Sequence, residues 1–121
     1  MSTGKQNSAL GAYGERVAES YLVDDGLTVL DRNWRCAAGE LDLVLRDGNT
    51  LVFCEVKTRS GTAYGHPLEA VDPVKTDRLV RLGDAWIEAH GVVAPDVRFD
   101  VVAVLRSPRG AAQVEHVRGL G

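Results

Sequence analysis

A chain of 121 residues, of which 45% are apolar and 26% charged, can bury one hydrophobic core. The composition predicts one globular domain over residues 8–121 and excludes a second. No 18-residue apolar run occurs, and residues 1–7 lack the apolar segment of a signal peptide, so we expect a cytoplasmic protein without a membrane partner. The net charge of −3 argues against a protein that coats polyanions, but it is compatible with a nucleic-acid enzyme whose basic residues cluster locally.

The N-terminal third predicts a tail followed by an amphipathic helix. Residues 1–7 are small and polar, which is typical of a disordered tail. From about Ser8 to Asp25, apolar residues recur at steps of three and four, and Gly26 can end the helix. Glu15 lies at the margin of the apolar stripe, so its side chain can lean toward the sheet rather than into water.

Residues 27–34 predict a strand, which leads into a β-hairpin with strands at 39–45 and 51–59. In the first hairpin strand, Leu41, Leu43 and Leu45 alternate with Glu40, Asp42, Val44 and Arg46, so we expect the three leucines on one face. Cys36 and Cys54 are too few for a disulfide framework or a zinc site, and we expect free thiols, with Cys54 in the core.

The turn of this hairpin decides how its two acids face each other. A turn at Asp47-Gly48 makes Glu55 the diagonal neighbour of Asp42, whereas a turn at Gly48-Asn49 places the two directly opposite. Either register puts both carboxylates on one face, about 5–8 Å apart, with Lys57 on the same face. An intermediate register or a β-bulge would separate them.

The second half predicts a glycine-rich loop containing Tyr64 and His66, then a helix with Asp72 as cap and Pro73 in its first turn. Its expected core stripe consists of Val74, Leu79, Leu82, Trp86 and Ala89, and Gly91 ends it. Strands are expected at residues 98–105 and 113–117. Helix, three strands, helix and two strands predict an α/β fold with a mixed sheet, because the crossover helix requires a parallel pairing.

Two carboxylates on one sheet face repel each other and lose hydration unless a cation compensates. Lys57 or a divalent metal can provide that charge. The spacing alone fits a solvent-exposed, salt-bridged face equally. Oxygen donors without cysteine or histidine favour Mg²⁺ or Mn²⁺ over zinc.

An acid, then acid-any-lysine on the next strand, after a helix with another acid, is the pattern of the PD-(D/E)xK nuclease superfamily. A longer string is more specific. It consists of Gly14-Glu15 with Ala18 and Tyr21-Leu22 following, Asn33-Trp34-Arg35-Cys36, Gly39-Glu40-Leu41-Asp42-Leu43-Val44, Phe53-Cys54-Glu55-Val56-Lys57-Thr58-Arg59, Lys75, and Arg98-Phe99-Asp100-Val101. This string closely resembles the YraN-like family of small bacterial proteins, predicted nucleases similar in fold to archaeal Holliday-junction resolvases. The resemblance covers about residues 9–105, with Cys54 and Leu41 as small departures from the usual valine and isoleucine.

The resemblance implies a restriction-endonuclease-like core, a mixed central β-sheet flanked by helices. It also implies that Asp42 and Glu55 bind Mg²⁺ or Mn²⁺, that Lys57 positions or activates water, and that Glu15 is an accessory acid. The expected activity is metal-dependent hydrolysis of a nucleic acid, with DNA favoured over RNA as the substrate. Branched or junction DNA is a candidate substrate. A junction resolvase would need a matching two-fold homodimer.

Four basic residues are candidates for phosphate binding: Arg35, Arg59, Lys75 and Arg78. Lys75, Arg78 and Arg81 form a ridge at helical spacing, and a solvated helix face fits this pattern equally. For Glu40, both a structural role and a substrate contact stay open. The alternative functions are a non-catalytic nucleic-acid-binding or assembly protein that keeps the nuclease fold, and a protein-interaction module without affinity for nucleic acid.

Overall fold

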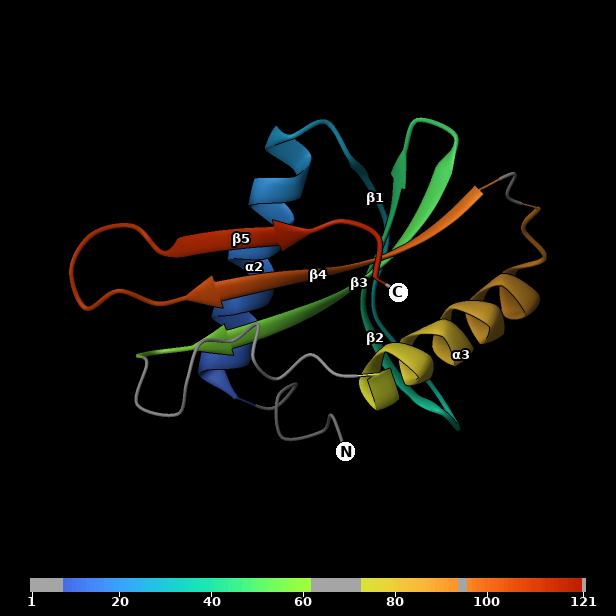
Figure 1. The fold of residues 1–121 in the computed structure, drawn as a ribbon, viewed down its shortest axis with the longest axis horizontal. Coiled ribbons are helices and arrows are strands. Elements are labelled where there is room, and N and C mark those ends of the chain that lie inside the picture. The colour runs from blue at the N-terminus through green and yellow to red at the C-terminus, as the bar shows by residue number, and fades with distance from the viewer. Residues whose placement is uncertain (1–7, 62–72, 94–95, 121) are drawn as a thin grey trace.

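The computed structural model describes residues 8–61, 73–93 and 96–120, which form a five-stranded sheet with one helix against each face (Figure 1). The elements are α2 (Ala9–Asp24), β1 (Thr28–Cys36), β2 (Gly39–Asp47), β3 (Thr50–Arg59), α3 (Pro73–His90), β4 (Asp96–Leu105) and β5 (Gln113–Val117). The strands lie in sequence order, and only the β3–β4 pair is parallel. The α/β class and the mixed sheet are confirmed, and the arrangement is consistent with a restriction-endonuclease-like core.

Several expectations lie outside the described residues. These are the N-terminal tail at 1–7, the loop with Tyr64 and His66, the Asp72 cap, and the side chains of Val74 and Lys75. Neither described helix is long and apolar enough to cross a membrane.

Each face of the sheet buries its own core. Against α2, the buried residues include Ala18, Leu22, Leu43 and Cys54, while Leu79, Leu82 and Trp86 of α3 pack on Leu41, Val44 and Phe53. Both cysteines are free thiols and Cys54 is fully buried, as expected. Both strands of the hairpin, β2 and β3, therefore lie between an apolar layer under α2 and another under α3.

The β2–β3 hairpin turns at Gly48-Asn49, because Asp47 pairs with Thr50. Gly48 has a φ of 61°, which glycine adopts readily in a two-residue hairpin turn. The structure therefore selects the second of the two expected registers. Pairing continues to Leu43 and Cys54, and the same register carried one step further sets Asp42 opposite Glu55.

The expected alternation of β2 is wrong at Asp42. Leu41 packs in the α3 core, whereas Leu43 packs in the α2 core, although strict alternation would keep them on one face. The register of β1 and β2 sets Asn33 across from Asp42, and Asn33 has a φ of 50°. A left-handed residue in the neighbouring strand therefore accompanies the irregularity, which turns Asp42 between the two faces.

Helix α2 has the expected bounds, with Ser8 Oγ accepting a hydrogen bond from Gly11 N at 2.8 Å and Gly26 at a φ of 99°. Its closest approach to the sheet is at Gly14, where a Cβ atom would lie 1.8 Å from Thr58 Oγ1. Only glycine fits there, so α2 is seated directly on the end of β3.

Helix α3 buries Leu79, Leu82 and Trp86, but Ala89 is exposed, contrary to the expected core stripe. His90, rather than Ala89, covers this end, because its ring stacks on Trp86 with centroids 4.1 Å apart. Gly83 brings α3 onto the sheet, since a Cβ there would lie 2.8 Å from the Phe53 ring and 2.9 Å from the Phe99 ring.

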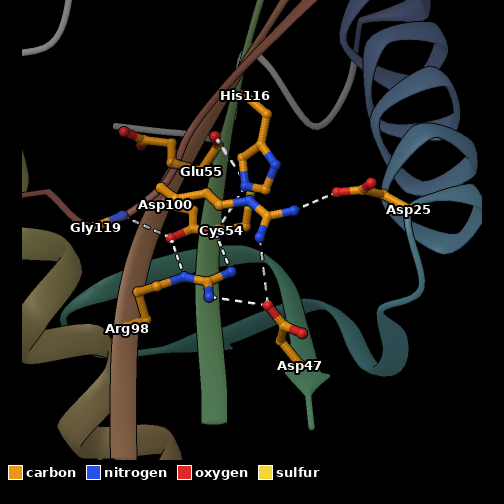
Figure 2. A network of polar contacts seen from close by, with 9 residues as sticks. Asp25, Asp47, Cys54, Glu55, Arg98, Asp100, His116 and Gly119 are labelled. Atoms are coloured by element: carbon orange, nitrogen blue, oxygen red, sulfur yellow. Dashed lines mark hydrogen bonds and ion pairs between the residues drawn. The ribbon is translucent and has the colours of Figure 1, made fainter.

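A buried ionic network centred on Asp100 joins the last strand to the hairpin (Figure 2). The Asp100 carboxylate, fully buried, receives two hydrogen bonds from Arg98 at 2.9 and 3.0 Å. His116 Nε2 and Gly119 N lie 2.7 and 3.0 Å from its oxygens, and Arg98 also donates to Asp47 at 2.9 Å. Burial raises the pKa of Asp100, but the hydrogen bonds from His116, Arg98 and Gly119 outweigh it and hold this pKa below its ordinary value.

Gly14→Ala should destabilise the fold, although alanine is the better helix former by about 1 kcal/mol. The added methyl would clash with Thr58, and overpacking of this kind costs about 1–3 kcal/mol. Urea unfolding measures the change, with Ser20→Ala on the exposed face of α2 as the control that reports helix propensity alone. Thr58→Ala should recover part of the loss in the double variant; a Gly14→Ala chain as stable as wild type would mean that α2 and β3 are not in this contact.

Asp100→Asn should lower the free energy of unfolding by about 1.5–3 kcal/mol at neutral pH, because the neutral amide loses the charge-assisted hydrogen bonds from Arg98, although Arg98 keeps its pair with Asp47. The folded pKa of Asp100 is lowered, so its ionised form contributes stability above the ordinary pKa of 3.8, and this contribution is lost as pH falls through the lowered pKa. The difference between wild type and variant should therefore shrink below about pH 4. A difference that stays constant through that range in acid unfolding curves would contradict this account.

Candidate active site

Asp42 stands where the ladder between β2 and β3 ends. Beyond the last pair, Leu43 and Cys54, Asp42 Oδ2 accepts a hydrogen bond of 2.7 Å from the backbone N–H of Val56. Asp42 is only 4% exposed, so this amide compensates a carboxylate that has lost most of its hydration. Because that N–H follows directly on Glu55, the hydrogen bond brings the Asp42 carboxylate beside the segment that carries Glu55 and Lys57.

Glu55 and Lys57 lie on the face of β3 that packs toward α3. Pairing of β3 with β4 is regular here, so alternate residues share this face with Phe53. Lys57 Nζ lies 3.5 Å from Glu55 Oε2, and Arg78 Nη2 of α3 lies 3.3 Å from Glu55 Oε1. The Glu55 side chain, 16% exposed, is therefore flanked by two cations. Arg78, a candidate for phosphate binding, reaches this acid instead of projecting freely from its helix.

Glu15 reaches the same region from α2, because Gly14 is seated on Thr58, the neighbour of Lys57. Glu15 and Asp42 both line a groove of about 520 Å³ between α2 and the first two strands. Oε2 of Glu15 is shielded from solvent. The groove thus contains two of the four expected catalytic residues, while Glu55 and Lys57 lie on the other side of the Asp42–Val56 contact. That all four act as one site stays a prediction.

An ion pair between Glu19, one helical turn after Glu15, and Arg32 of β1 also lines the groove, with Arg32 Nη2 2.9 Å from Glu19 Oε2. The hydrogen bond from Arg32 lowers the pKa of Glu19 against the opposing effect of burial. Arg16 also lines the groove and has no ion pair among the described residues. Sequence reasoning missed Arg16; the only available signal was its place directly after Glu15.

Glu40 is buried beside Asp42 in sequence and holds Arg35. Glu40 Oε2 lies 3.3 Å from Arg35 Nε, and the Glu40 side chain is only 1% exposed. Its other oxygen is buried without a hydrogen bond in the described structure. Arg35 uses only Nε in this pair and is half exposed, so its terminal nitrogens can still donate to a phosphate.

The two other candidates for phosphate binding are Arg59 and Lys75. Arg59 ends β3 and donates from Nη1 to the Thr58 carbonyl at 3.1 Å, without an ion pair in the described part of the chain. Lys75 lies within α3, but its side chain is outside the described residues. Their roles stay predictions.

The donor set suits a hard cation. In the described ranges, no three histidine, cysteine, aspartate or glutamate side chains gather into a cage that could hold a metal by themselves. Mg²⁺ commonly binds through one or two carboxylates and completes its shell with water and substrate phosphate. Asp42 and Glu55 lie on neighbouring strands, and the Val56 amide that donates to Asp42 directly follows Glu55, so two oxygen donors of the kind that Mg²⁺ takes lie on adjacent backbone segments.

Comparison with known proteins places the chain among small bacterial relatives. Residues 14–104 match the family model described as "Uncharacterised protein family UPF0102". A UPF0102 protein of Beutenbergia cavernae is 60% identical over 117 residues, covering 97% of this chain and 99% of that protein. UPF0102 proteins of Nocardioides sp. and Streptomyces griseus are 56% and 54% identical, each over 93% of this chain and over 91% and 95% of their own lengths. The resemblance carried by the motifs is confirmed, and the chain belongs to the uncharacterised protein family UPF0102, the YraN family.

Proposed function

We propose that this protein is a metal-dependent endonuclease that hydrolyses phosphodiester bonds of DNA, with branched or junction DNA as its substrate. One observation carries the proposal: the buried Asp42 carboxylate accepts a 2.7 Å hydrogen bond from the backbone N–H of Val56, the residue that stands between Glu55 and Lys57 in the chain. Two carboxylates on neighbouring strands are costly to bury unless a cation binds there. The PD-(D/E)xK resemblance gives the same residues the same roles.

In this proposal Asp42 and Glu55 would hold Mg²⁺ or Mn²⁺. A metal bound there would supply Lewis acidity toward the phosphoryl oxygen and the attacking water. Lys57 donates to the phosphate as negative charge develops there. Glu15, which shares the groove with Asp42, accepts a hydrogen bond from the attacking water and so orients it.

The cations around Glu55 are compatible with metal binding. Arg78 contacts Oε1 and Lys57 contacts Oε2, but a carboxylate offers about four acceptor positions, so each oxygen keeps one. Without metal, Lys57 and Arg78 compensate the charge of Glu55. With metal and phosphate bound, the same two cations are placed to turn toward the added negative charge.

DNA in the cytoplasm is the proposed substrate, and a two-fold homodimer is the assembly that a four-way junction would require, since the junction has two-fold pseudo-symmetry. The experiment that tests the activity compares junction DNA, linear duplex DNA and RNA, each with Mg²⁺, Mn²⁺ or chelator. The proposal expects cleavage of DNA only in the presence of a divalent metal, and fastest on the junction.

The alternative is a nucleic-acid-binding or assembly protein that keeps the fold without turnover. One observation favours it: the proposed metal ligand Glu55 is already neutralised by two cations, as in a structural ion-pair cluster. Metal-independent binding without cleavage of any substrate would make this alternative the better account.

Glu55→Gln and Asp42→Asn should each reduce cleavage about 100-fold or more, because the amides keep shape but remove charge that holds the metal. The amide of Asp42→Asn retains an oxygen to accept from Val56. Loss of the Glu55 ion pairs should lower the metal-free stability by about 1–3 kcal/mol, because Lys57 and Arg78 lose their common partner, and folding should survive. The matched control is Asp77→Asn, an exposed acid paired only with Arg81 in the described chain, which should cleave like wild type. Mn²⁺-induced thermal stabilisation should vanish in both site variants; persistent cleavage in Glu55→Gln would point to a contaminant or another site.

Lys57→Ala should separate metal binding from turnover. Removal of this cation leaves the carboxylates more negative, so Mn²⁺ affinity should be kept or raised, while the rate falls about 100- to 1000-fold because a donor to the developing charge is lost. Single-turnover cleavage and Mn²⁺ titration measure the two effects on the same samples. A variant that loses metal affinity in proportion to its rate would assign Lys57 to the structure of the metal site instead.

A further inference from the structure

The arginines of this chain fall into two groups. One group is paired with acids: Arg32 with Glu19, Arg35 with Glu40, Arg78 with Glu55, Arg81 with Asp77, Arg98 with Asp47 and Asp100, and Arg118 with Asp25 and Asp47. The other group has no ion pair among the described residues: Arg16, Arg46, Arg59, Arg106 and Arg109. On a chain with a net charge of −3, unneutralised arginines are the places where an anion can bind.

Arg106 differs from the rest of the second group because it is held in place without an acid. Its guanidinium carbon lies 5.1 Å from the centroid of the Tyr13 ring, a cation–π contact. Its backbone N–H donates to the Arg59 carbonyl at 2.7 Å, which fixes the start of its side chain against the end of β3. The Arg106 side chain is thus oriented, exposed and keeps its N–H donors for an external acceptor.

Arg106 lies next to the candidate active site. Its partner Tyr13 precedes Gly14, the residue seated on Thr58, and Glu15 follows it. Tyr13 and Glu15 point about 200° apart around the helix, so they project to different sides of Gly14. The backbone hydrogen bond from Arg106 to Arg59 is what places Arg106 near Lys57. Arg59, two residues beyond Lys57, and Arg16, in the groove with Glu15, place two more unneutralised arginines around the same contact.

We propose that Arg106, held over the Tyr13 ring, binds a backbone phosphate of the nucleic acid beside the scissile phosphate, with Arg59 and Arg16 contacting its neighbours. The inference rests on the proposed function, because the acids and Lys57 define where the scissile phosphate lies. A guanidinium suits this task, since its planar set of donors matches phosphate oxygens and its charge persists at any physiological pH. It contacts the backbone, so it contributes affinity and position without reading sequence.

The test is fluorescence anisotropy of labelled junction DNA, duplex DNA and duplex RNA in chelator, between about 50 and 200 mM NaCl. Arg106→Ala should weaken binding about tenfold, as expected for loss of a charged hydrogen bond, and should reduce the salt slope by about one. Arg46→Ala is the matched control, because Arg46 is also exposed and unneutralised but lies at the far end of β2, by the Gly48 turn. It should leave the slope unchanged.

Two variants separate a phosphate contact from a structural role. Arg106→Lys keeps the charge and should keep the slope, with weaker binding because a lysine binds phosphate through a single point charge. Tyr13→Leu removes the ring that orients Arg106, so it should weaken binding while the slope stays near that of wild type. Urea midpoints of all variants check folding, and Arg106→Gln replaces Arg106→Ala if alanine is not tolerated.

The outcomes distinguish this inference from the proposed activity. Equal slopes for Arg106→Ala and Arg46→Ala would overturn the inference and leave the endonuclease proposal standing. Binding that depends on Arg106 but never leads to metal-dependent cleavage would support the inference and remove the endonuclease. If the wild-type protein bound none of the three nucleic acids but bound phosphatidylglycerol vesicles through Arg106, the inference would be overturned in favour of a membrane phosphate.

Discussion

The hydrogen bond from the Val56 backbone N–H to Asp42 Oδ2 is the contact on which the candidate site depends. At this point β2 stops pairing with β3, and the separation would leave a buried N–H without a strand partner. The Asp42 carboxylate, itself buried, takes that N–H and is compensated by it. If either the Val56 N–H or the Asp42 carboxylate moved away, the other would be left buried without a hydrogen bond. This one contact therefore fixes both where β2 separates from β3 and where the Asp42 side chain points. Glu55 and Lys57 are held beside Asp42 as a consequence.

Charge compensation then decides which polar residues remain available to a ligand. Glu55 is neutralised by Lys57 and Arg78, and the buried Asp100 is neutralised by Arg98. These pairs lower the cost of burying carboxylates, but they also remove the arginines involved from any anion-binding surface. A chain with more acids than bases can therefore still present positive charge, provided that its unpaired arginines gather at one place. The end of β3 beside α2 is such a place.

How far the sequence could predict this arrangement follows from the range of each interaction. The hairpin, its turn at Gly48-Asn49 and both helices rest on local period and turn chemistry, and they were predictable. The break in alternation at Asp42 was not, because it is matched by a left-handed Asn33 on the neighbouring strand. Likewise, helical spacing placed Arg78 on a basic ridge, but only tertiary packing could show that Arg78 reaches Glu55. Local pattern predicts which elements form; the partners of charged side chains depend on how those elements meet.

The bounds of the family match separate the proposed catalytic residues from the Tyr13–Arg106 contact. The match runs from residue 14 to residue 104, so it includes the Gly14 contact, Glu15, Asp42, Glu55 and Lys57. Tyr13 and Arg106, which hold each other across the end of the sheet, both lie just outside it. The acids and the lysine thus lie inside the segment that the family model matches, whereas the two partners of the Tyr13–Arg106 contact lie just beyond its ends. A division of this kind is physically reasonable, because phosphodiester chemistry requires a fixed set of groups at the reacting atoms, while a backbone phosphate farther along can be bound from many positions.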